Sequence, residues 1–351
     1  MIRRISLHIK TRPPSSRQPG RNSQQTSFTF ADVRHPPTKA SMSSLLLRGL
    51  SSSRSGYQGA RVLVTVAGFS GARGGKQQHT EAASGVREVE LKRLPGKDEG
   101  IVEVLMCRHN ARNALGHVFV SQMKELVSMV SSDSEVRVLV FRSLVPGVFC
   151  AGADLKERAL MNNQETDLFV HGLRSLMTQI ALLPMPTIAA IDGVAVGGGL
   201  ELALACDLRT AASSAQMGLI ETTRGLLPGA GGSQRLPRTV GMALAKELIF
   251  TGRCVGGQAA AEMGLVNRAI EQDQTGEAAY AEALALAREI LPQAPVAVRM
   301  AKEAMNRGLE VDITSAMAIE RMCYAQVIPT RDRQEGMVAF IEKRPPFYIG
   351  K

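Results

Sequence analysis

From residue 86 onward, the sequence alternates between short β-branched runs and longer segments whose apolar residues recur at helical spacing. Residues 87–94 and 101–106 predict two strands, and the sequence Pro-Gly-Lys-Asp between them predicts a hairpin turn. A helix is expected next, because four apolar residues follow at spacings of four, three and four. These residues are Phe119, Met123, Leu126 and Val130. A β-branched run at 136–141 then predicts a third strand.

The same alternation continues toward the C-terminus. It predicts a helix around residues 168–183, a buried strand at 187–191, a helix at 198–206 and a strand around 208–212. Strands and helices that alternate in this order predict a layered α/β fold. The chain shows no repeat of fixed period, so a solenoid is not expected.

The last third of the chain, after Asn267, is predicted to be wholly helical. One helix presents an apolar face, and Pro292 and Pro295 mark the break that follows it. That face consists of Tyr280, Leu284, Ala287 and Leu291. Methionines in the later helices are typical of a core or a subunit interface rather than of a cofactor site. They are Met305, Met317, Met322 and Met337, and we expect this region to take part in oligomerisation.

The first 80 residues differ in composition from the rest. They hold 13 Lys and Arg and a single acid, whereas the remaining residues hold 29 Lys and Arg against 31 acids. This segment is rich in Ser, Gly and Pro and cannot form a packed core. Leucines and arginines among the serines of residues 42–54 are typical of a mitochondrial transit peptide. We therefore expect import into the mitochondrial matrix, with Met42 as a possible true start and an ordinary disordered tail as the alternative.

The sequence therefore predicts three regions: a transit peptide and leader at 1–80, a core at 81–275 and a helical C-terminal region at 276–351. Because the body is nearly neutral, the basic excess of the whole chain does not indicate a nucleic-acid-binding patch. No stretch approaches the ~18–20 uncharged apolar residues of a membrane span. The five cysteines are widely spaced without a Cys-x-x-Cys pair, so neither a disulfide framework nor a zinc site is predicted.

Two glycine-rich turns occur at residues 197–199 and 229–232. Neither fits a phosphate-binding loop, because Gly-x-x-x-x-Gly-Lys-Ser/Thr and Gly-x-Gly-x-x-Gly are both missing. The first turn leads from a predicted strand into a predicted helix and so exposes backbone N–H groups at a helix N-terminus. A ligand oxygen can approach the N–H of Gly198 closely, since no side chain obstructs it. The turn at 150–154 is the best candidate for a second donor, and two such donors would form an oxyanion hole.

Two glutamates accompany this predicted hole. Glu201 lies three residues after Gly198, in the first helical turn, where a carboxylate could also simply complement the helix dipole. Glu221 lies in the mainly apolar segment 217–222, where burial would raise its pKa, although alone it could be a surface acid. Taken together, the two acids fit the pair that general acid–base catalysis requires.

These residues lie in motifs that closely resemble the enoyl-CoA hydratase (crotonase) family. The motifs are Phe149-Cys-Ala-Gly-Ala-Asp-Leu-Lys-Glu157, Ala189-Ala-Ile-Asp-Gly-Val-Ala-Val-Gly-Gly-Gly-Leu-Glu-Leu202, Leu227-Pro-Gly-Ala-Gly-Gly-Ser-Gln-Arg-Leu-Pro237 and the C-terminal Phe340-Ile-Glu-Lys-Arg344. The resemblance spans about residues 86–351. It implies a spiral of ββα turns with a C-terminal helical trimerisation region, assembled as a trimer or a dimer of trimers.

The resemblance also implies roles for individual residues. Ala153 and Gly198 match the family's oxyanion-hole donors. Glu201 and Glu221 match its two hydratase glutamates, of which one handles water and the other exchanges a proton at the α-carbon. Four further residues match positions that contact CoA, the first three at the adenine pocket and the last at the phosphates. They are Ala151, Asp154, Leu155 and Lys343.

One member of the family carries a row of lysines on an early helix that is associated with RNA binding. Here the corresponding positions are His117, Ser121 and Glu125, and Lys124 is the only lysine or arginine in that helix. The phosphate attraction behind RNA affinity is therefore largely missing, and RNA is not an expected partner.

The activity implied by the resemblance is addition of water to a 2-enoyl-CoA thioester in mitochondrial fatty acid or branched-chain acyl-CoA metabolism, without a metal or redox cofactor. An isomerase that moves one proton can work with a single carboxylate, so the presence of two acids favours hydration. Two alternatives stay open: an acyl-CoA isomerase, and a non-catalytic CoA- or RNA-binding member of the fold.

Overall fold

The structure is a computed structural model that describes residues 87–351. The chain divides into two units, residues 1–77 and residues 78–351, and everything below concerns the second unit. The expected transit peptide and leader at 1–80 lie outside the described residues, so they remain a prediction.

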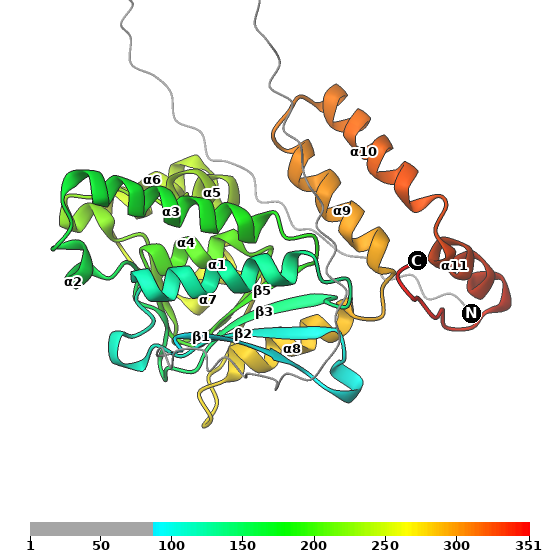
Figure 1. Cartoon of the computed structure of the whole chain (residues 1–351), viewed down its shortest axis with the longest axis horizontal. Coiled ribbons are helices and arrows are strands. Elements are labelled where there is room, and N and C mark those ends of the chain that lie inside the picture. Colours follow the sequence, from blue (N-terminus) through cyan, green and yellow to red (C-terminus); the bar gives the residue numbers. More distant parts are fainter. Residues whose placement is uncertain (1–86) are drawn as a thin grey trace, which may run out of the picture. The chain divides into compact units, whose positions relative to one another are not determined.

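A six-stranded sheet runs through this unit (Figure 1). Its first two strands form the expected antiparallel hairpin, in which Val89 lies opposite Met106. The other neighbouring strands pair in parallel. In sheet order, the strands are β1 (Val89–Arg93), β2 (Ile101–Met106), β3 (Val138–Ser143), β5 (Thr187–Ile191), β7 (Leu208–Ala212) and β10 (Arg268–Ile270).

A second sheet consists of four very short strands that the sequence analysis did not anticipate. In sheet order, they are β4 (Val148–Cys150), β6 (Val194–Val196), β8 (Gln216–Gly218) and β9 (Val255–Gly256). Runs of two or three residues are too short to show the period-two pattern of a strand. The turn at 150–154 directly follows β4 of this sheet.

Helical segments connect the strands of the two sheets. They are α1 (His117–Ser131), α2 (Leu155–Arg158), α3 (Asn163–Ala181), α4 (Gly198–Ala205), α5 (Gly232–Val240), α6 (Met242–Thr251) and α7 (Gly257–Glu262), with 3₁₀ turns η1 (Gly96–Asp98), η2 (His109–Ala111) and η3 (Glu221–Arg224). Three times the chain passes from the large sheet to the small sheet and then into helices: β3 and β4 precede α2, β5 and β6 precede α4, and β7 and β8 precede η3. The expected ββα spiral and α/β class are confirmed.

The large sheet is covered by helices on both faces. α1 and α3 pack on one face, and α8 (Ala278–Ile290) packs on the other (Figure 1). Successive side chains of a strand point to opposite faces. In β3, Leu139 and Phe141 therefore enter the core beneath α1 and α3, whereas Val138 and Val140 pack against α8. Burial on both faces explains why residues 138–141 of this strand are continuously apolar.

The C-terminal region differs in one respect from the expectation of a wholly helical segment. β10 extends the large sheet beside β7 before the chain enters α8. The later helices are α9 (Pro295–Gly308), α10 (Ile313–Val327) and α11 (Arg331–Glu342), of which α9 and α10 pack together (Figure 1). Lys302 of α9 ties this pair to the body, because its ammonium donates to the Met185 carbonyl at 2.9 Å and to Asp207 at 2.6 Å.

The four methionines of these helices are exposed. The exposed fractions are 63% for Met305, 55% for Met317, 61% for Met322 and 63% for Met337. They do not belong to a core of this chain, which leaves a subunit interface as their expected role. No helix within residues 87–351 is long and apolar enough to span a bilayer.

Candidate active site

The predicted donors and acids line one cavity of about 750 Å³. Ala153 borders it from the loop after β4, Gly198 and Glu201 from α4, and Glu221 from η3. Segments far apart in the sequence thus place two amides and two carboxylates around the same space, which is large enough for a small-molecule ligand. Ala151 and Leu155 also line it, as expected of residues near a bound CoA.

The loop before α4 and the loop after β4 touch each other. A Cβ atom on Gly198 would lie 3.6 Å from the Ala153 nitrogen, and one on Gly152 would lie 3.5 Å from the Gly198 nitrogen. A side chain at Gly152 would also stand 2.7 Å from the Val196 carbonyl oxygen, so only glycine permits this approach. Gly198 is the first residue of α4, where a helix leaves its N–H groups without intrahelical acceptors. The Ala153 and Gly198 amides therefore lie close together at the wall of the cavity.

Hydrogen bonds on either side of Ala153 hold its loop in place. The Leu115 N–H donates to the Gly152 carbonyl at 2.8 Å, and the Asp154 N–H donates to the Leu115 carbonyl at 3.2 Å. Gly199 lets α4 rest directly on the end of β4, because any Cβ there would collide with the Cys150 carbonyl. Both halves of the predicted oxyanion hole are thus fixed by the backbone.

Glu201 is 3% exposed, and its carboxylate is held by the second glycine-rich turn. Its Oε1 accepts hydrogen bonds from the N–H groups of Ala230 and Gly232, each at 2.8 Å. Burial raises the pKa of Glu201, while these two donors oppose the rise. The sequence analysis found this turn but assigned it no role, because nothing local indicates which distant carboxylate it binds.

Two arginines brace that turn from outside. Arg174 donates to the Gly229 carbonyl at 3.1 Å, and Arg235 donates to the Ala230 carbonyl at 3.2 Å. Their charges also favour the ionised form of Glu201. Neither was identified from the sequence, since an arginine on a helix is usually a solvated residue.

Glu221 has a different environment. Burial raises its pKa to about 7, in the direction expected from its apolar segment, and the charge of Glu201 acts the same way. Its Oε2 is buried without a hydrogen-bond partner among the described residues. A Cβ on Gly197 would lie 3.2 Å from Glu221 Oε1, so the carboxyl group lies directly against the turn that leads to Gly198.

Asp154 is not among the residues that line the cavity, and its expected contact with CoA stays a prediction. Its side chain caps α2 by accepting from the N–H groups of Lys156 at 3.0 Å and Glu157 at 3.2 Å. An aspartate before a short helix is explained by this cap. Lys343 ends α11 and does not line the cavity either, so its contact with CoA phosphates stays a prediction.

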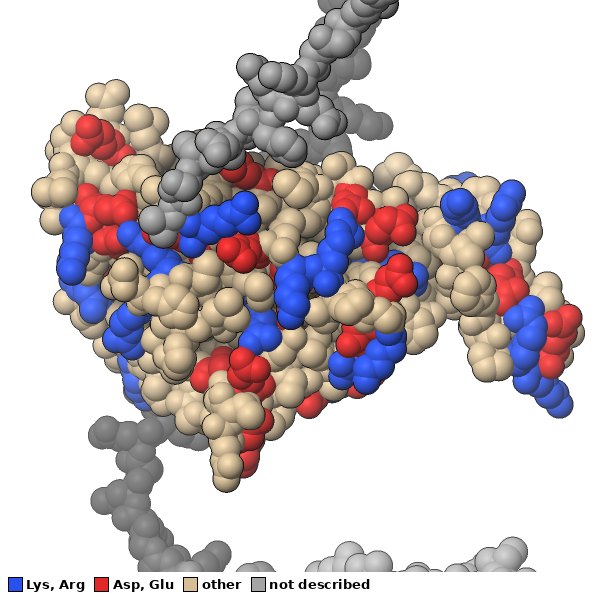
Figure 2. All heavy atoms as spheres, turned by 60° about the horizontal axis from the view of Figure 1, so that its bottom comes forward, with Lys and Arg blue, Asp and Glu red and all other residues tan. Residues whose placement is uncertain are grey.

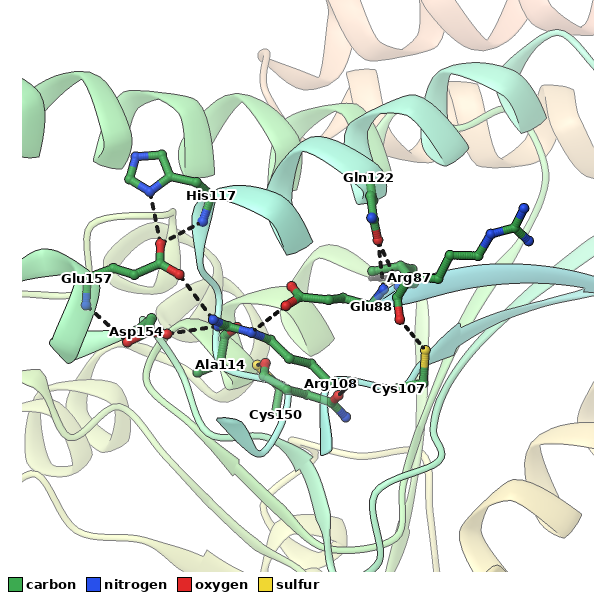
Figure 3. A network of polar contacts seen from close by, with 12 residues as sticks. Arg87, Glu88, Cys107, Arg108, Ala114, His117, Gln122, Cys150, Asp154 and Glu157 are labelled. Carbon is green, nitrogen blue, oxygen red and sulfur yellow. Dashed lines mark hydrogen bonds and ion pairs between the residues drawn. The ribbon is translucent and has the colours of Figure 1, made fainter. Parts of the chain in front are cut away.

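Arg108 organises the polar contacts around this cap (Figure 3). Its guanidinium pairs with Glu88 at 2.9 Å, Asp154 at 2.9 Å and Glu157 at 3.0 Å. It also donates to the Ala114 carbonyl at 2.7 Å. These partners lie before β1, beside Leu115 and in or next to α2, so Arg108 joins the segments that flank the Ala153 amide. The sequence contained no signal for this role, because the partners are 6 to 49 residues away.

The family described as enoyl-CoA hydratase/isomerase matches residues 96–351. The chain is 64% identical over 283 residues to mitochondrial enoyl-CoA hydratase domain-containing protein 2 of Mus musculus, covering 81% of this chain and 95% of that one. It is 55% identical to mitochondrial methylglutaconyl-CoA hydratase of Mus musculus, over 75% of this chain and 84% of the relative. The crystal structure of enoyl-CoA hydratase from Bacillus anthracis superposes with a TM-score of 0.72 at 40% identity, covering 76% of this chain and all of that chain.

Proposed function

Because the chain belongs to the enoyl-CoA hydratase/isomerase family, we propose that it adds water across the double bond of a 2-enoyl-CoA thioester. The observation that carries this proposal is the single cavity lined by Ala153, Gly198, Glu201 and Glu221. Attack of water on the β-carbon moves negative charge onto the thioester oxygen, and two backbone N–H groups stabilise that charge. CoA enters as part of the substrate, and no metal or redox cofactor is needed for these steps.

The environments of the two glutamates suggest how they divide the work. Glu201 receives two N–H hydrogen bonds that favour its ionised form, so we assign it as the base that takes a proton from water. Glu221 lacks such bonds at its buried oxygen and has a pKa of about 7, so it is the acid that delivers a proton to the α-carbon. Water supplies hydroxide to the β-carbon, and the double-bond electrons pass through the enolate to the new C–H bond.

The direct test is turnover of crotonyl-CoA by the full chain. We expect the absorbance of the conjugated thioester to fall as 3-hydroxybutyryl-CoA forms. Conversion of a 3-enoyl-CoA to its 2-enoyl isomer without hydration would support the isomerase alternative. Tight CoA binding without turnover of straight, branched or carboxylated 2-enoyl-CoA substrates would contradict the enzyme assignment and favour a binding protein.

The rate of hydration should depend on pH through Glu221. Its raised pKa means that it carries its proton below about pH 7 and loses it as the pH rises through that value. If Glu221 is the acid, kcat/KM for hydration falls above about pH 7, and this limb disappears in Glu221→Gln. A rate that instead rises through the same range would assign Glu221 as the base.

The exposed methionines of α9 to α11 support packing against further copies of the chain, as a trimer or a dimer of trimers. The leader composition and the mitochondrial relatives support import into the matrix. Acidic and basic side chains are interspersed over the face shown in Figure 2. That mixture does not favour RNA as a partner on this face.

A further inference from the structure

Four arginines line the cavity, Arg112, Arg158, Arg174 and Arg224, and none of them forms an ion pair within residues 87–351; Arg158 and Arg224 are the two that act electrostatically on Glu221. Arg158 is the last residue of α2, and Arg224 is the last residue of η3. The one recorded polar contact of either guanidinium is a long one, from Arg224 to the Thr223 hydroxyl at 3.5 Å. In contrast, Arg174 and Arg235 near Glu201 are engaged with backbone carbonyls. Arg158, which is half-buried, and Arg224, which is exposed, therefore bring two positive charges to the cavity without an ion pair inside the described part of the chain.

These two charges lie near the reacting end of the cavity. Arg224 follows Glu221 by three residues in the same short turn, and both arginines exert an electrostatic effect on the Glu221 carboxyl that opposes the rise in its pKa. Glu221 in turn lies against Gly197, next to the Gly198 amide. A ligand group that meets these arginines must be close to the carbon atoms on which Glu221 acts.

The phosphates of CoA are the competing anion for Arg158, because α2 begins at Leu155, which the resemblance matches to the adenine pocket. With the thioester oxygen at Ala153 and Gly198, the long pantetheine arm separates those phosphates from the α-carbon beside Glu221 and Arg224. A purely hydrocarbon acyl chain is also a poor partner, because it would remove water from two guanidinium groups without offering an acceptor. A carboxylate offers two acceptor oxygens that match the guanidinium donors.

We propose that the acyl group of the natural substrate carries a carboxylate beyond the double bond, and that Arg158 and Arg224 bind it. This inference rests on the proposed hydratase function and names the substrate class of the same site. Both arginines act here as specificity residues: they anchor the far end of the acyl group and so orient the double bond between the two glutamates.

Binding is tested first with saturated esters that cannot react. Calorimetry on the full chain would compare glutaryl-CoA with its terminal methyl ester, which has a similar size and no charge. We expect glutaryl-CoA to bind about 10- to 100-fold more tightly, the range typical of a hydrogen bond to a charged group. Arg158→Met and Arg224→Met should each shrink this ratio, whereas Arg307→Met, a change on α9 at a residue that does not line the cavity, should leave it unchanged.

Kinetics then separate this inference from the proposed function. We expect kcat/KM for glutaconyl-CoA to exceed that for crotonyl-CoA, and the ratio of the two values to fall toward 1 in Arg158→Met and Arg224→Met. Turnover of crotonyl-CoA without any carboxylate preference would overturn this inference and leave the hydratase proposal standing. Preferential binding of glutaryl-CoA without turnover of either enoyl ester would contradict the hydratase proposal and leave the carboxylate-binding inference standing. An equal loss of affinity for glutaryl-CoA and its methyl ester in both variants would assign the arginines to CoA itself and overturn the inference.

Discussion

Replacing either Glu201 or Glu221 by glutamine is expected to lower kcat for hydration by roughly 10²- to 10⁴-fold, the usual contribution of a general acid or base. Glutamine keeps the size of the side chain but can neither take a proton from water nor deliver one to carbon. The measurement is the initial rate with crotonyl-CoA at saturating concentration, together with the thermal unfolding midpoint of each variant.

The fold should survive both changes. In Glu201→Gln, the amide oxygen can still accept from Ala230 and Gly232, so the turn that contacts it keeps its hydrogen bonds. In Glu221→Gln, a buried carboxyl with an unpartnered oxygen is replaced by a neutral group. Glu99→Gln, at an exposed position outside the cavity, is the matched control and should keep the full rate. A rate within about twofold of the parent for Glu201→Gln or Glu221→Gln would remove that residue from the mechanism.

Replacing Arg108 by methionine should destabilise the protein by about 1–3 kcal/mol, the cost of leaving polar groups that are largely shielded from water without their hydrogen-bond partner. Glu88, Asp154 and Glu157 would then be left close together without the cation they share. Burial opposes ionisation of Asp154, yet the Glu157 N–H and Arg108 keep the pKa of Asp154 below its usual range. The quantity to measure is the urea midpoint at pH 7.

Two further variants sharpen this experiment. Arg253→Met breaks an ion pair with Glu247 in which both side chains are about half exposed, and it should cost less than about 1 kcal/mol. Arg108→Lys keeps the positive charge but loses the several donors of the guanidinium group, so we expect its stability to lie between that of the parent and that of Arg108→Met. We also expect a lower kcat, because the Ala153 amide would be held less firmly. If Arg108→Met unfolds at the same urea concentration as Arg253→Met, the cluster in Figure 3 does not hold this loop.

The large sheet was predictable because its strands are long enough to show a pattern. The expected strands at 187–191 and 208–212 agree with β5 and β7, and the expected hairpin agrees with β1 and β2. The small sheet was not predictable, since its strands have two or three residues and depend on neighbours distant in sequence. β10 also has only three residues, so its segment was predicted to be helical like the region that follows it.

Part of the candidate site was also predictable, because some of its residues are close together in the sequence. Gly198 and Glu201 share the first turn of α4, so their spacing in the sequence already places them together. The apolar neighbours of Glu221 predicted a raised pKa, and burial of this carboxyl in the structure acts in the same direction. The cap that Asp154 provides for α2 was not predicted, because a motif position does not reveal whether a carboxylate points into a cavity or caps a helix.

Sequence alone determined the α/β class, the order of the main elements and the short-range pairing of an amide with an acid, because hydrophobic periodicity and helical spacing act over a few residues. Tertiary structure alone decided that the Ala153 amide meets Gly198, that the turn at 229–232 binds Glu201, and that Arg158 and Arg224 face the same cavity as Glu221. Apart from Arg224, which shares a turn with Glu221, these groups come from segments 29 or more residues apart, and they meet only when the spiral stacks its turns.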